Sequence, residues 1–80
     1  MITFEVIKQK ANLISDAMGT DSFLDVFDSE MNTRELIPAD ISAVAELAEV
    51  YNRAKVKEMS RDEAAEKQKE LYEAWRKERF

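Results

Sequence analysis

The chain has 80 residues and a formal net charge of −5 at pH 7, with one glycine, one proline and neither cysteine nor histidine. This length excludes a multidomain protein and predicts one domain, residues 1–80, whose core contributes roughly a few kcal/mol of net stability. The lack of cysteine excludes disulfides and thiolate chemistry, the lack of histidine removes the commonest acid–base and metal-binding side chain, and we expect no cofactor.

Helix-favouring residues dominate the composition, which predicts an all-α protein. The longest apolar runs fall far short of the roughly 20 residues that a membrane span requires. The chain does not open with a basic segment followed by an apolar one, as a secretory signal would. We therefore expect a cytoplasmic protein with no membrane partner.

Residues 1–18 repeat apolar side chains at spacings of three and four, which predicts an amphipathic helix. Thr3 is a candidate for its start and Gly19 for its C-terminal stop. The alternative is a short strand, because Ile2, Phe4 and Val6 alternate with polar residues. No second strand is evident to pair with it, so we favour the helix. The helical repeat consists of Phe4, Ile7, Ala11, Ile14 and Met18.

Residues 21–31 predict a second, shorter helix. Ser22 and Asp25 have the spacing of a capping box at its start. Most of its surface is apolar, so we expect the segment to be largely buried, as a plug at one end of the C-terminal helices. The apolar side chains are Phe23, Leu24, Val26, Phe27 and Met31.

Residues 32–38 lack a helical period and predict a linker with Leu36 and Ile37 directed inward. Beyond it, Pro38 and Asp40 suit the first turn of a helix, because proline needs no partner there and aspartate can cap or complement the helix dipole. The apolar repeat that follows predicts the helix itself. It consists of Ile41, Val44, Leu47, Ala48, Tyr51 and Ala54.

The last helix is predicted to begin at Arg61, because Ser60 and Glu63 form a capping box. Acidic residues in its first turns and basic residues in its last turn match the helix dipole. A short turn at Met59–Ser60 makes this helix antiparallel to the preceding one and places Tyr51 and Ala54 near Ala65 and Gln68. The whole pattern predicts a small bundle of three to four helices built on a C-terminal antiparallel hairpin.

The segments Val44–Ala48 and Met59–Lys69 resemble the helical hairpin of the small YnzC-like proteins of low-GC Gram-positive bacteria. The resemblance covers residues 41–80 and implies a helical hairpin in a cytoplasmic protein. That family is uncharacterised, so the resemblance implies a fold and no chemistry. Its hairpin opens the chain, whereas residues 1–40 precede the hairpin here.

The densest acidic group lies in the second predicted helix and consists of Asp21, Asp25, Asp28 and Glu30. An EF-hand loop needs oxygen ligands at alternate positions around a glycine, which this segment lacks, so we interpret the group as a solvated face and expect no metal. Two of the 17 acidic residues could still meet to perform acid–base catalysis. The sequence identifies no pocket for them, and an enzyme is the least favoured reading.

Net charge is uneven along the chain. Residues 1–40 hold eight acidic and three basic residues, whereas residues 41–80 hold nine of each. The acidic half favours a protein partner with a basic surface, although solubility alone also explains it. Basic residues of the second half alternate with acids and form no continuous stripe, so we expect no nucleic-acid partner.

Trp75 is interpreted first as a core residue that joins the two halves of the molecule. A tryptophan is too large to be covered by the hairpin alone, so we expect Phe23, Phe27 or Ile14 to lie above it. If it is exposed instead, it becomes an anchor for a partner. The aromatic residues of the hairpin could also stack on bases, but their helical spacing favours the core.

These observations predict a small acidic, non-enzymatic protein-interaction module, such as an adaptor or inhibitor encoded by a bacterium or a phage. The alternative is a structural or assembly subunit completed by self-association, because the last helix has few apolar residues to cover its aromatic side chains. The candidate partner surface consists of Asp21, Asp25, Asp28, Glu30 and Trp75.

Overall fold

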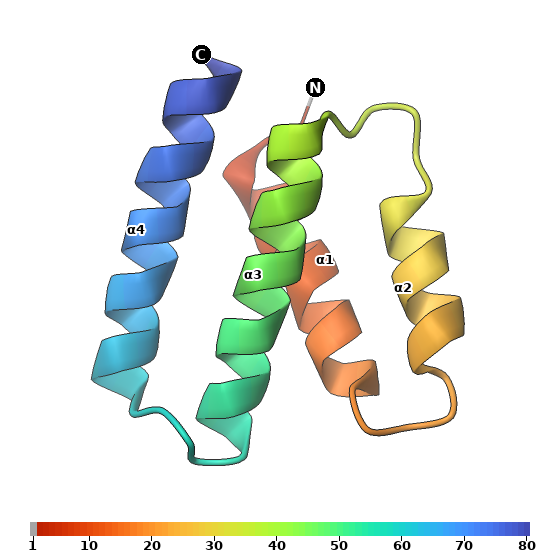
Figure 1. The fold of residues 1–80 in the computed structure, drawn as a ribbon, viewed down its shortest axis with the longest axis vertical. Helices are drawn as coiled ribbons and strands as arrows, with labels where there is room; N and C mark the ends of the chain where they lie inside the picture. Colours follow the sequence, from red (N-terminus) through yellow and green to blue (C-terminus); the bar gives the residue numbers. More distant parts are fainter. Residues whose placement is uncertain (1) are drawn as a thin grey trace.

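A computed structural model describes residues 2–80, and within that range the chain folds into four helices and no strand (Figure 1). The prediction of a small all-α bundle is therefore confirmed. None of these helices combines the length and the apolar character needed to cross a membrane. The helices are α1 (Phe4–Ala17), α2 (Phe23–Met31), α3 (Pro38–Lys55) and α4 (Arg61–Arg79).

The first segment is a helix and not a strand. Thr3 is its N-cap, and the Thr3 hydroxyl accepts a hydrogen bond from the backbone N–H of Val6 at 3.3 Å. The helix ends at Ala17, and Gly19 follows in the left-handed region with φ of 81°. A residue with a side chain would be strained in that conformation, which explains why the only glycine of the chain stands there.

Helix α3 is the centre of the molecule, because it packs against both α1 and α4. Figure 1 shows α4, α3 and α2 side by side, with α1 behind α3. The backbone is correspondingly flat, with extents of 33 × 29 × 15 Å. Both termini of the described chain lie at the same end of the bundle.

The core lies mainly between α1 and α3. The apolar repeats of the two helices face each other, and burying one large aliphatic side chain contributes about 1.5–3 kcal/mol. Helix α4 adds only Trp75, and α2 adds no fully buried residue. The buried cluster consists of Ile2, Ile7, Ala11, Ile14, Ala43, Val44, Leu47, Ala48 and Trp75.

The C-terminal hairpin is confirmed in its main features. Ser60 is the N-cap of α4, and the Ser60 hydroxyl accepts from the Glu63 backbone N–H at 3.1 Å. The Tyr51 hydroxyl donates to Oε1 of Gln68 at 2.7 Å, which fixes the register of α3 against α4. The connection between α3 and α4 is longer than the predicted turn, because α3 already ends at Lys55. Within this connection, Lys57 adopts a left-handed φ of 62°.

Two expectations about the start of α3 need correction. Ile41 does not belong to the buried stripe, because 40% of its surface is exposed. Ile37 is not directed inward either, since it is 39% exposed, whereas Leu36 is half-buried. The residue of this turn that is fully buried is Asp40, whose relative exposure is 0%. The pattern of apolar residues could not reveal a buried carboxylate.

The predictions for α2 are wrong in two respects. Ser22 adopts φ of −84° and ψ of −4°, which is helical backbone, and its hydroxyl makes no capping hydrogen bond. A capping side chain requires extended backbone at that position, so no capping box forms. The helix also does not plug the hairpin, because it packs against α1 at the edge of the molecule and none of its residues is fully buried.

Candidate functional site

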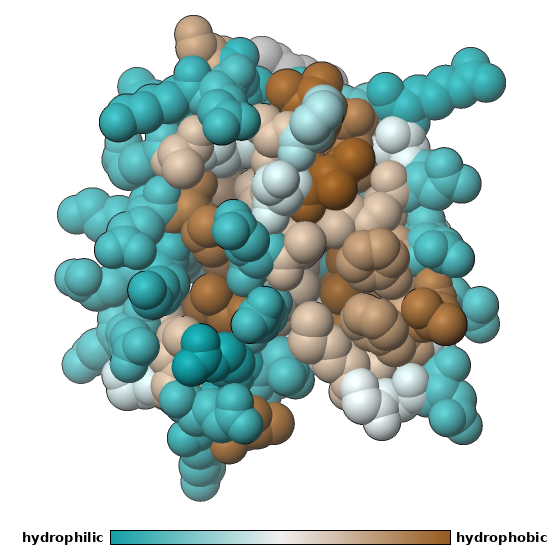
Figure 2. Space-filling model, viewed as in Figure 1, coloured by the Kyte–Doolittle hydropathy of each residue, from teal (hydrophilic) through white to brown (hydrophobic). Residues whose placement is uncertain are grey.

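Helix α2 presents an apolar and acidic surface to solvent. Five of its nine residues are apolar, yet none is fully buried, and Leu24 is 69% exposed. The rings of Phe23 and Phe27 lie 5.7 Å apart and are half-buried against the core. Figure 2 shows hydrophobic residues gathered over α2 on the side of the molecule that faces the viewer.

The acidic residues of this region divide into two groups. Asp21, Asp25 and Asp28 are exposed, and none of them forms an ion pair with residues 2–80. Glu30 is different, because its side chain is only 23% exposed and its carboxylate lies 3.5 Å from Nζ of Lys10. The same Lys10 ammonium donates to the Glu30 backbone carbonyl at 2.9 Å. Glu30 therefore holds α2 on α1 and is not free for a partner.

The exposed acids lie near Leu24, the most exposed apolar side chain of α2. Residues three or four apart on a helix are neighbours on its surface. Leu24 stands four residues before Asp28 and is its neighbour on the surface of α2, whereas Asp25 is adjacent to it in the chain and Asp21 lies in the turn before the helix. We call the exposed residues of this surface, together with its two half-buried rings, the α2 face. It consists of Asp21, Phe23, Leu24, Asp25, Phe27 and Asp28.

Trp75 belongs to the core and not to the accessible surface, since only 5% of it is exposed. Its indole N–H donates to Oδ1 of Asp40 at 2.6 Å. The second oxygen of that carboxylate accepts from Nη1 of Arg79 at 2.9 Å and from the backbone N–H of Ile37 at 3.0 Å. One buried carboxylate therefore caps α3 and binds two side chains of α4. The polar atom that an exposed tryptophan would offer to a partner is already occupied.

Trp75 does join the hairpin to the first half of the chain, but through a residue that the sequence did not indicate. Its ring centroid lies 5.4 Å from that of Phe4 in α1, and Phe4 also meets Tyr72 edge to face at 5.0 Å. The aromatic rings nearest to it do not include Phe23 or Phe27, which pair with each other. Packing against Phe4 and the hydrogen bond to Asp40 give Tyr72 and Trp75 structural roles.

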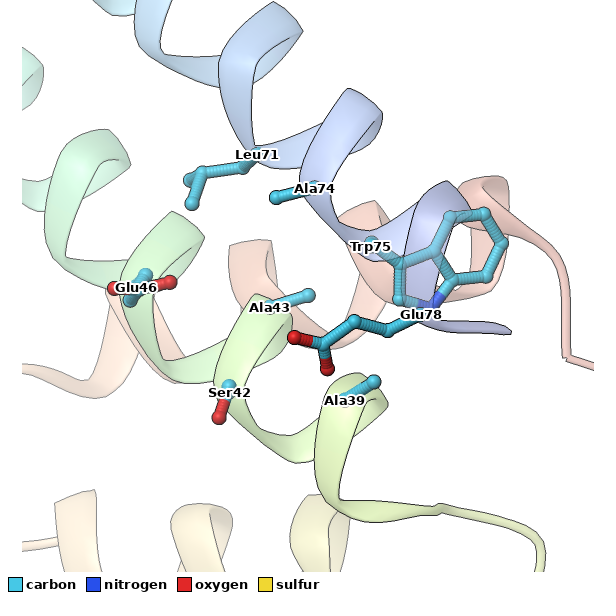
Figure 3. Close-up of a pocket in the computed structure, with 8 residues that line it drawn as sticks. All are labelled: Ala39, Ser42, Ala43, Glu46, Leu71, Ala74, Trp75 and Glu78. Carbon is cyan, nitrogen blue, oxygen red and sulfur yellow. The ribbon is translucent and has the colours of Figure 1, made fainter. Parts of the chain in front are cut away.

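A groove runs between α3 and α4 beside Trp75 (Figure 3). It has a volume of about 110 Å³, which is well below the range of about 300–1,000 Å³ usual for small-molecule sites. Small side chains of both helices form much of its wall, and a glutamate of each helix lines it. Its residues are Ala39, Ser42, Ala43, Glu46, Leu71, Ala74, Trp75 and Glu78.

The acidic residues of the described range 2–80 form no candidate metal site. No three Asp or Glu side chains of this range are placed to hold a metal ion. Burial, followed by the nearby Glu5 carboxylate, raises the pKa of Tyr51 above its ordinary value of about 10. Tyr51 is therefore neutral at physiological pH, where it serves as the hydrogen-bond donor to Gln68.

Comparison with known proteins gives no relative for this chain. A scan against protein-family models and searches of curated proteins and of solved structures found no match. The resemblance of residues 41–80 to the YnzC-like hairpin stays a prediction.

Proposed function

We propose that the protein is a small, acidic, non-enzymatic protein-interaction module, an adaptor or inhibitor that binds a partner with a basic surface through the α2 face. The observation that carries the proposal is that Leu24 is 69% exposed in a segment whose carboxylates Asp21, Asp25 and Asp28 form no ion pair with residues 2–80. A surface that needed only solubility would not combine these acids with an exposed leucine and two half-buried phenylalanine rings.

The chemistry of the face supports a partner that offers apolar and basic groups together. Burying Leu24 and the outer edges of Phe23 and Phe27 would supply the hydrophobic part of the binding energy. The three aspartates would contribute mainly to the rate of association and to the choice of partner, since exposed charges steer encounter more than they add affinity. The remaining negative charge of residues 1–40 acts in the same direction.

Self-association remains the second candidate, and exposed apolar residues favour it. Phe80 is 74% exposed, although one side of its ring meets Trp75 edge to face at 5.9 Å. A second copy could cover Phe80 or Leu24. The burial of Trp75 within a single chain removes the strongest sequence argument for this alternative, because Trp75 needs no second subunit to cover it.

Position-specific photo-crosslinking tests the proposal. A photo-crosslinking amino acid replaces Leu24 in the intact chain, which is expressed in the cells that naturally produce the protein. The matched control places the same amino acid at Val56, which is 55% exposed in the α3–α4 connection. We expect an adduct with a different protein from position 24 and not from position 56.

The charge requirement is tested by adding three substitutions, Asp21→Asn, Asp25→Asn and Asp28→Asn, to the position-24 variant. The yield of the adduct should fall strongly relative to the position-24 variant, because the steering charges are removed while the photo-crosslinking amino acid stays in the same place. Equal adducts from positions 24 and 56, or no adduct at either, would contradict the proposal. An adduct with the mass of two copies would favour self-association.

A further inference from the structure

The groove between α3 and α4 is lined by two acidic side chains. Glu46 and Glu78 line it, one from each helix, and neither forms an ion pair with any residue in the range 2–80. In Figure 3 the Glu78 side chain extends from α4 toward Ala39 and Ala43 of α3. These two carboxylates have no cation within the described chain to balance them at the groove.

The position of Glu78 is unfavourable for the isolated protein. It lies in the last turn of α4, where the helix dipole disfavours negative charge and the other charged residues are basic. Arg79, the next residue, does not compensate it, because its guanidinium is bound to the buried carboxylate of Asp40. Arg76 and Lys77 of the same turn are exposed and form no ion pair with Glu78, so a cation bound at the groove would supply one.

We propose that this groove binds a lysine side chain of a partner protein. The alanine methyl groups and Leu71 would contact the four-carbon stem of the lysine, and the carboxylates of Glu46 and Glu78 would hold its ammonium. The volume of about 110 Å³ suits a single long side chain better than a whole metabolite. Apolar walls with anionic groups complement lysine in both parts of its structure.

This inference does not rest on the α2 face. The groove is formed by α3 and α4, whereas α2 lies on the other side of α3 in Figure 1. The two surfaces could bind the same partner or different ones. The test below therefore uses peptides that need only the groove, so its failure would leave the proposed function standing.

The probes are three capped alanine pentapeptides that differ in the central residue. One carries lysine, the second norleucine, which keeps the four-carbon stem without the ammonium, and the third glutamate. Each is titrated into the full chain while NMR follows the methyl groups of Ala39, Ala43, Ala74 and Leu71. We expect the lysine peptide to shift these signals until the groove is saturated. It should bind about fivefold more tightly than the norleucine peptide. The glutamate peptide should leave the signals unchanged.

Variants of the groove identify the groups responsible. Glu46→Gln and Glu78→Gln should each weaken the lysine peptide by about two- to fivefold, the range of an exposed ion pair. Ala74→Leu should abolish binding by filling the groove, and Ala74 is exposed, so the fold should tolerate the larger side chain. Glu73→Gln removes the same charge from α4 outside the groove and should have no effect.

Four results would overturn the inference. The first is the absence of any shift, and the second is equal affinity for the lysine and norleucine peptides. The third is a set of shifts spread over acidic residues of the whole surface, with no preference for the groove. The fourth is an equal loss from Glu73→Gln and Glu78→Gln, which would mean that only the overall charge matters. Leu24→Ser should bind the lysine peptide as well as the wild type does.

Discussion

Asp40 shows how much one side chain can organise in a chain of this size. Its carboxylate is fully buried and accepts from the backbone N–H of Ile37, the indole of Trp75 and the guanidinium of Arg79. The first contact starts α3, and the other two fix the last turns of α4 beside it. A buried charge is tolerated only when it is paired and hydrogen-bonded, and Asp40 meets both conditions.

Asp40→Asn should therefore be strongly destabilising. The amide keeps the shape and one acceptor, but its NH₂ group would face two donors, the Ile37 N–H and the Arg79 guanidinium. Hydrogen bonds to charged groups contribute about 1.5–3 kcal/mol each, so we expect a loss of at least about 2 kcal/mol in the free energy of unfolding. Urea denaturation followed by tryptophan fluorescence measures it.

The control for that experiment is Asp21→Asn, which changes an exposed carboxylate that makes no ion pair with the described residues. Its effect should stay within about 0.5 kcal/mol, as for most surface substitutions. Similar losses from both variants would mean that the negative charge of the chain matters and the buried contacts of Asp40 do not.

Tyr51 gives a prediction about alkaline pH. Because burial and Glu5 raise its pKa in the folded state, the unfolded chain loses the phenolic proton first. Its contribution to stability is therefore complete below pH of about 10 and is lost as pH rises through the higher pKa of the folded state. Titration of tyrosinate absorbance, compared between wild type and Tyr51→Phe, should show the missing tyrosine titrating above its ordinary range. A Tyr51 that titrates at or below that range would contradict the packing of α1 over it.

At the scale of helices, two serines in equivalent positions behave differently. Ser60 has extended backbone, and its hydroxyl accepts from the third amide of α4. Ser22 has helical backbone and makes no such bond at the start of α2. The sequence pattern is the same in both places, so it could not distinguish them.

Ser60→Ala and Ser22→Ala form a matched pair. The first removes a hydrogen bond at the start of α4 and should cost about 0.5–2 kcal/mol. The second removes a hydroxyl without a capping bond and should cost less than about 0.3 kcal/mol. Thermal and urea unfolding of the two variants measure the difference. Equal losses would show that the two helices start in the same way, against the geometry described here.

Apolar periodicity was enough to locate the helices, and the N-caps of α1 and α4 formed as predicted, because these signals act over a few residues. The apolar repeats of α1 and α3 became the core, and Gly19 and Ser60 marked helix ends as expected. The fate of α2 was not predictable in this way. Burial of its apolar residues depends on which helices lie beside it, and that is decided by contacts distant in sequence.

The candidate site was predictable only in part for the same reason. The local sequence grouped Asp21, Asp25, Asp28 and Glu30 as one acidic cluster, but nothing local showed that Lys10 binds Glu30, 20 residues away. Likewise, the groove glutamates Glu46 and Glu78 are brought to one place by the hairpin alone. Pairing of distant residues requires the tertiary structure.

For the whole molecule, the flat arrangement explains why α2 stays uncovered. Helix α3 packs against both α1 and α4, whereas α2 packs mainly against α1 and forms an edge of the bundle. Within residues 2–80, no further helix packs on the outer side of α2. The proposed function therefore requires a folded monomer whose α2 face stays open until a different protein binds it.

Molecular mass in solution tests that requirement most directly. Light scattering over a wide concentration series should give the monomer mass of 9.3 kDa for wild type throughout, and Leu24→Ser should give the same mass. A wild-type dimer that Leu24→Ser converts to monomer would contradict the account. The α2 face would then be filled by a second copy of the chain, and the protein would be an assembly subunit.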